Sequence, residues 1–179
     1  MEAPFWFPAP MDANELLRVA FKGLHKEVVE DVAGLSDEEL FWQPTSGVNH
    51  IGFLLWHLIR DEDTVVSQSV LHEPELWSRE RWFEQFAMDE HEQGTGLGSD
   101  RLEAFRYPLP LLLEYAVQVW EQTDAALAAM PAGRLEEALP WATEWRLAEL
   151  LTTGCLNHGW VHLGEIRQLR GLQGWRFRE

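Results

Sequence analysis

Four segments of the chain place apolar residues at the three- and four-residue intervals that form one face of a helix. They lie at about residues 12–34, 46–71, 109–130 and 146–170. Asp12 or Asn14 can cap the first segment, and Gly34 can end it. Pro108 and Pro110 suit the first turn of the third segment. The pattern therefore predicts four long amphipathic helices.

The connections between these helices differ in length. Ser36 and Glu39 form an S-x-x-E capping box for a short turn between the first two helices. The connection at about 72–107 is long and contains a glycine-rich stretch, 94–98. No repeat of 20–50 residues is visible. The order predicts an all-α four-helix bundle with a long crossover connection between helices 2 and 3. No strand alternation is convincing, although a small extended pair near 135–145 stays open.

Length and charge limit the class of protein. A chain of 179 residues with 46% apolar residues is predicted to form one domain, 1–179, in which residues 1–11 are an extended N-terminal leader. Thirty acidic residues against 14 basic ones give a net charge of −16. Phosphate binding requires clustered basic residues, so the composition predicts no nucleic-acid partner and disfavours anionic membranes.

The compartment is predicted from what the sequence lacks. Cys155 is the only cysteine, which rules out an intramolecular disulfide and favours a reducing compartment, by default the cytoplasm. No apolar run reaches the roughly 20 residues that a membrane helix needs. The ten tryptophans are expected to fill the core and a dimer interface, with stacking on a cofactor as the alternative for one or two of them.

Two histidines carry the strongest chemical signal. His158 and His162 are four residues apart in a predicted helix, so their rings project from one face and can bind one ion together. Their segment is strongly apolar, and buried imidazoles need partners. His57 lies in the apolar stripe of the second helix and is the candidate third ligand, with a hydrogen-bonded core histidine as the alternative. Three protein ligands leave one coordination position open, which is the catalytic arrangement.

Other side chains near these histidines are further candidates for the site. Asp61 follows His57 by four residues and is the best placed to reach the site or to orient a ligand. Glu62 and Asp63 are expected to be a solvated acidic end. His50 lies about 10.5 Å from His57 along the helix axis, so direct co-ligation is disfavoured. Cys155 shares a face with His158 and can ligate zinc, but a buried apolar role is preferred. Surface positions are predicted for three further histidines: His25, His72 and His91.

The sequence also resembles a known family. The stretch LSDEELFWQPTSGVNHIGFLLWHLIRDED and the later NHGWVHLGEI are similar to motifs of the DinB/YfiT-like family, whose members are four-helix bundles with a three-histidine metal site. The resemblance places one ligand at His57 and the other two at His158 and His162. The chain departs from the family motif at Glu165, where glutamine is usual. If this carboxylate faces the site, it is an acid/base candidate.

The resemblance implies a function and a cofactor. We expect one divalent metal ion per chain, zinc or nickel, and a small-molecule substrate. The relatives include transferases that use thiols such as bacillithiol or mycothiol, as well as hydrolases, so a metal-dependent enzyme with an open coordination position is expected. The alternative is a non-catalytic metal- or ligand-binding module of a stress response. The resemblance also implies a homodimer.

Overall fold

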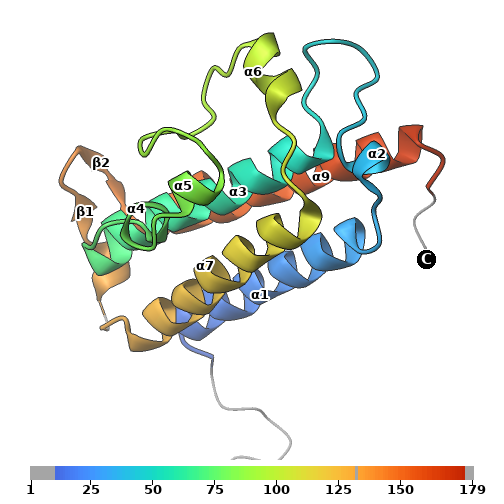
Figure 1. Cartoon of the computed structure of the whole chain (residues 1–179). Helices are drawn as coiled ribbons and strands as arrows, with labels where there is room; N and C mark the ends of the chain where they lie inside the picture. The colour runs from blue at the N-terminus through green and yellow to red at the C-terminus, as the bar shows by residue number, and fades with distance from the viewer. Residues whose placement is uncertain (1–10, 132, 176–179) are drawn as a thin grey trace, which may run out of the picture.

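Four long helices form the body of the computed structural model, which describes residues 11–131 and 133–175 (Figure 1). They are α1 (Ala13–Val32), α3 (Ile51–Val65), α7 (Leu109–Ala129) and α9 (Asn157–Leu172). Helix α1 contacts α7 and α9, and α3 also contacts α7 and α9, so the four helices close a ring around the core. The predicted all-α four-helix bundle is confirmed. The predicted leader 1–11 lies almost wholly outside the described residues.

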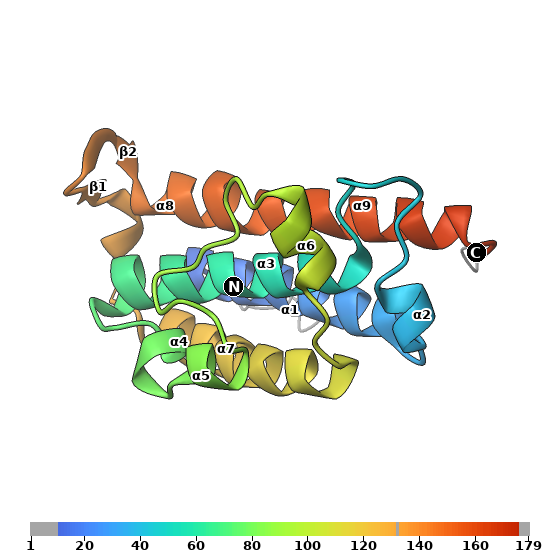
Figure 2. The same ribbon diagram turned by 45° about the horizontal axis from the view of Figure 1, so that its top comes forward.

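The long crossover connection is also present. Figure 1 shows that α3 and α7 run in the same direction, so the chain must return along the bundle between them. This return carries three short helices: α4 (Leu76–Arg79), α5 (Trp82–Gln85) and α6 (Ser99–Ala104). Trp77, Trp82 and Phe86 of this segment are buried in the main core. The crossover is therefore a packed layer of the protein, which Figure 2 shows lying across α3.

Shorter elements complete the chain. The capping box of Ser36 and Glu39 starts α2 (Asp37–Leu40), as predicted. A 3₁₀ turn, η2 (Arg134–Glu136), leads into a two-stranded antiparallel hairpin of β1 (Ala138–Leu139) and β2 (Ala142–Arg146), which is the extended pair that the sequence left open. Within the described residues, no helix has the length and apolar character needed to cross a membrane.

Two of the predicted long helices contain π turns. The second continues from α3 into η1 (Val66–Leu71), and the fourth consists of α8 (Leu147–Glu149), η3 (Leu150–Leu156) and α9. In η3 the N–H of Asn157 donates to the carbonyl of Thr152, five residues earlier. The Thr152 hydroxyl meanwhile donates to the Ala148 carbonyl. Helical periodicity predicts these segments as helix but does not show that one turn is wider than the rest.

Helix α3 begins at a buried histidine. His50 is the N-cap, and its Nδ1 accepts a hydrogen bond of 3.1 Å from the Phe53 N–H. Its Nε2 consequently carries the proton and donates to the Leu102 carbonyl, also at 3.1 Å. Burial lowers the pKa of His50 to about 4; the bond to Leu102 opposes the shift, and the Arg106 guanidinium adds to it. His50 thus has a capping role at the start of the helix.

This cap makes stability depend on pH. The pKa of His50 is about 4 in the folded chain and about 6.5 in the unfolded chain, so the unfolded state binds more protons between these values. The contribution is complete above pH 6.5 and is lost as the pH falls toward 4, amounting to about 3 kcal/mol. Urea unfolding of His50→Asn, which keeps a capping acceptor without titrating in this range, should show a flatter pH dependence than the parent. Equal slopes would contradict the assignment.

Candidate metal centre

Three histidines from two helices meet on one side of the bundle. His57 lies in α3, and His158 and His162 lie in the first turns of α9, which packs beside α3. One ring nitrogen from each lies within 4.8 Å of the others, and all three residues are half-buried. In the described part of the chain, this is the group of histidine, cysteine and acidic side chains that could hold a metal ion. The structure therefore brings together the three residues that the sequence singled out.

Each of the three rings is held by an oxygen on its Nδ1 side. The Gln93 carbonyl lies 2.9 Å from Nδ1 of His57. The Asp61 carboxylate lies 3.2 Å from Nδ1 of His158, and the Glu165 carboxylate lies 2.7 Å from Nδ1 of His162. An acceptor at Nδ1 places the proton there and leaves the Nε2 lone pair free, which is how metal-binding histidines are oriented in proteins.

The facing nitrogens require a cation between them. Nε2 of His158 and Nε2 of His162 are 2.7 Å apart. If both Nδ1 atoms donate to carboxylates, two lone pairs face each other at this distance, and a proton or a metal ion must lie between them. Tetrahedral zinc bound by imidazoles separates its ligand nitrogens by about 3.3 Å, so an adjustment of less than 1 Å would accommodate the ion. The donor set thus fits a divalent metal.

The pKa values of two of the histidines shift in opposite directions. Burial lowers the pKa of His57, and the neighbouring His162 adds to this effect. For His158, the hydrogen bond to Asp61 raises the pKa, and this outweighs the opposing effect of burial. The lowered pKa favours the neutral form of His57, which is the form that binds a metal, whereas the raised pKa of His158 makes metal binding there compete with a proton.

A loop of the crossover closes over His57. Gly94 has φ +79°, and an added Cβ would lie 2.8 Å from the Trp56 ring and 3.0 Å from Nδ1 of His57. Only glycine fits this approach without displacing the ring. The loop is attached to α3 because the Arg60 side chain donates to the Glu92 carbonyl and the Thr64 hydroxyl donates to the Gln93 side chain. The glycine-rich stretch is visible in the sequence, but the Gln93 carbonyl is not, because a backbone acceptor has no signature in the sequence.

The acidic residues that follow His57 have two different environments. Asp61 faces the site, as predicted. The expectation that Glu62 and Asp63 form a solvated acidic end is wrong, since their exposed fractions are 2% and 0%. Glu62 accepts from the Thr123 hydroxyl at 2.6 Å and contacts Nε2 of His25 at 2.9 Å. Successive helical residues point about 100° apart, so only the first of the three can face the metal site.

The remaining candidates lie elsewhere. His25 was predicted at the surface, and this is wrong, because its ring stacks on Trp120 at 4.6 Å and pairs with buried Glu62. His72 and His91 are exposed, as predicted. Cys155 is buried, and burial raises the pKa of its thiol well above the ordinary value, which agrees with the preferred apolar role.

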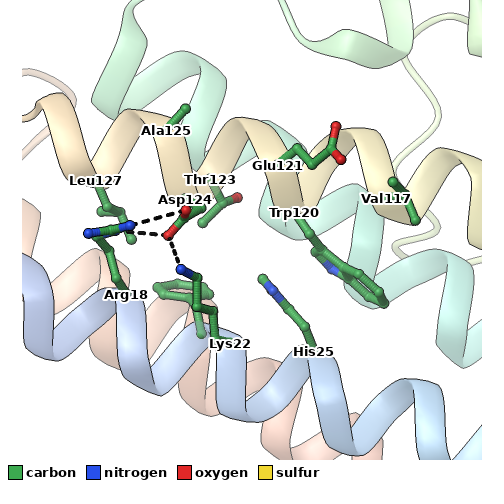
Figure 3. A pocket seen from close by; sticks show the side chains of 11 residues that line it. Arg18, Lys22, His25, Val117, Trp120, Glu121, Thr123, Asp124, Ala125 and Leu127 are labelled. Carbon is green, nitrogen blue, oxygen red and sulfur yellow. Dashed lines mark hydrogen bonds and ion pairs between the residues drawn. The ribbon is translucent and has the colours of Figure 1, made fainter.

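A separate cavity of about 380 Å³ lies between α1 and α7 (Figure 3). His25 and Trp120 line it, but none of the three clustered histidines does. Three of its charged side chains satisfy one another, since Arg18 and Lys22 both bind Asp124 at 2.8–2.9 Å, and this cluster holds the pKa of the Asp124 carboxyl down to about 2. The cavity therefore offers less chemistry than the histidine cluster.

Comparisons with known proteins agree with the four-helix fold. The family model described as "DinB superfamily" matches residues 20–166, a range that contains all three histidines. A crystal structure of a conserved protein from Enterococcus faecalis has a TM-score of 0.76 and 19% sequence identity to the chain, covering 90% of this chain and 96% of that one. This likeness concerns the fold. No curated protein matches the chain. On the family match, the chain belongs to the DinB superfamily.

Proposed function

We propose that the chain is a metal-dependent enzyme that binds one divalent ion, zinc or nickel, through His57, His158 and His162. The observation that carries this proposal is that all three rings have an oxygen acceptor at Nδ1 and that one nitrogen of each ring lies within 4.8 Å of the others. Superfamily membership supports a metal-binding protein. A divalent ion with an open coordination position supplies Lewis acidity and lowers the pKa of a water or thiol that it binds.

The chain's own residues would prepare this chemistry. Asp61 and Glu165 hold the Nδ1 protons of His158 and His162, which keeps both imidazoles in the ligand tautomer. The Glu165 side chain is 49% exposed, so it can also exchange a proton with a substrate beside the site. Phe53 stacks against His57 with an interplanar angle of 4°, which limits rotation of that ring. These contacts fix the ligands before any substrate arrives.

The reaction that we propose is transfer to a thiol, with hydrolysis as the other possibility in the same class of site. In the test, zinc-loaded or nickel-loaded protein is mixed with bacillithiol or mycothiol and 1-chloro-2,4-dinitrobenzene. The sulfur–carbon bond forms as chloride leaves, and the absorbance of the product gives the rate. We expect turnover above the uncatalysed reaction and its loss in His158→Ala.

A second arm separates the alternatives. Hydrolysis of p-nitrophenyl acetate without a thiol would favour the hydrolase. A protein that binds metal but turns over neither substrate would favour a non-catalytic module of a stress response. A homodimer and a cytoplasmic location stay predictions that accompany this proposal. Size-exclusion chromatography tests the dimer directly.

A further inference from the structure

A groove of about 380 Å³ is lined by Glu165, the residue whose carboxylate contacts His162, although none of the three clustered histidines lines it. It lies between the segment that precedes α3 and the outer side of α9, two parts of the chain that Figure 2 shows close together. Its apolar walls are the side chains of Val48, Leu54, Val161 and Leu169. Val48 and Val161 are 36% and 51% exposed, so this wall is open to solvent. The volume falls in the range of small-molecule sites.

Glu165 connects the groove to the metal centre. Its carboxylate lies 2.7 Å from Nδ1 of His162, and the residue also lines the groove. Leu54 precedes His57 by one helical turn on α3, so the groove borders the cluster on both helices. A molecule lying in the groove would therefore have one end next to the clustered histidines.

The charge of the residues that line the groove indicates which ligands can bind there. The polar residues of the groove are Glu165 and two carboxamides, Asn49 and Gln168. No lysine or arginine is found among the described residues that line it. The chain as a whole carries a charge of −16, which adds a repulsive field for anions. Apolar walls with hydrogen-bonding amides and one carboxylate complement a neutral or positively charged organic molecule.

A glycine keeps the groove open. Glycine inside a helix is unfavourable relative to alanine, so its presence calls for a reason. At Gly159 the reason is packing, because an added Cβ would lie 2.5 Å from the Leu24 side chain. At Gly164 an added Cβ would meet nothing within 4 Å, and the residue lines the groove. A side chain at position 164 would enter the space that a ligand needs.

We propose that this groove binds the body of the substrate, a neutral or positively charged organic molecule with an apolar part, beside Glu165. The inference rests on the proposed function, because the adjoining metal centre would act on the end of the molecule that leaves the groove. Gly164 and Gln168 determine specificity in this scheme, and they touch none of the three metal ligands in the described contacts.

The test uses three probes of nearly equal shape: benzylamine, benzyl alcohol and benzoate. Binding to the full chain is followed by NMR through the backbone amide of Gly164 and the side-chain amide of Gln168. We expect benzylamine and benzyl alcohol to shift both signals. Benzoate should bind at least about fivefold more weakly than benzylamine, the factor that one charge pair at a solvent-exposed site supplies. Gln168→Lys should reverse this order.

A pair of variants provides the control. Gly164→Leu should abolish the shift of the Gln168 signal. Gly171→Leu should leave it unchanged, because Gly171 lies two turns further along α9, also has nothing within 4 Å of an added Cβ, and does not line the groove. Equal binding of benzoate would overturn the proposal, as would loss of binding in both variants. If the parent binds no probe and Gly164→Leu changes the oligomeric state, the proposal is also overturned, and the groove is instead a contact between copies of the chain.

The same probes distinguish this inference from the proposed function. Titrations are run on the metal-loaded protein and on protein treated with a chelator. Probe binding at Gly164 in a chain that takes up no metal would support the groove and contradict the metal-dependent enzyme. Metal uptake without any shift at Gly164 would contradict the groove alone.

Discussion

Protein carrying His158→Ala is expected to lose its metal ion. Wild-type protein purified without a histidine tag should contain about one zinc or nickel ion per chain by elemental mass spectrometry. The variant should contain almost none, because two imidazoles would remain from a set of three whose nitrogens lie within 4.8 Å. Loss of even an outer hydrogen-bond partner typically weakens metal binding 10- to 100-fold, so removal of a ligand should cost more than about 100-fold.

The control for this experiment is His91→Ala. His91 is an exposed histidine outside the cluster, so its removal changes the histidine count without changing the site. This variant should keep about one ion per chain. The metal site would be disproved by a wild-type protein that takes up no divalent ion at neutral pH. Metal retained at full stoichiometry in His158→Ala would show that the ion is held elsewhere.

The largest effect on stability is expected at Asp63. Its carboxylate has no exposed surface and accepts from the backbone N–H groups of Leu76 and Trp77, at 3.0 and 2.9 Å. It also accepts from the hydroxyls of Ser67 and Tyr115, at 2.9 and 2.7 Å. Asp63→Ala would leave these buried donors without an acceptor. Breaking such a buried charged network costs about 3–5 kcal/mol.

Urea unfolding at neutral pH measures this loss. Glu30→Ala serves as the matched control, because this carboxylate is 57% exposed and its contact with Lys26 is 3.7 Å long. A surface pair of this kind contributes little, and the control should unfold within about 0.5 kcal/mol of the parent. A loss of less than about 1 kcal/mol in Asp63→Ala would contradict the role assigned to the network.

The bundle was predictable because periodicity reports burial directly. Apolar residues at helical spacing mark the face of each long helix that packs inward, and the capping box at Ser36 fixed the start of α2. The length of the crossover at about 72–107 was predicted, but its packing against the bundle was not. Its order depends on Asp63, Arg60 and Glu75, where Arg60 pairs with Glu75 at 2.7 Å and is fully buried. Buried ion pairs between distant segments leave no periodic pattern in a sequence.

The parts of the site that lie on one helix were easier to predict than the contacts between helices. His158 and His162 are four residues apart on one helix, so their spacing alone places them together. The prediction of His57 as the third ligand also needed the family resemblance, because the sequence of one helix does not show which other helix packs beside it. Glu62 and His25 were wrongly predicted at the surface, because they pair with each other across two helices and Glu62 also accepts from Thr123, and one segment of sequence does not show such partners. The Gln93 carbonyl was beyond reach, because any residue type supplies the same atom.

The direction in which His158 and His162 point depends on the number of residues in the π turn η3. A turn that closes over five residues instead of four holds one extra residue, and that residue rotates everything after it by about 100°. His158 follows this turn almost immediately, so its direction relative to the buried Leu147 and Leu151 depends on the extra residue. A relative that lacked one residue in 150–156 could keep all three histidines and still fail to bring them together. The number of residues in this turn therefore matters to the site as much as the histidines themselves.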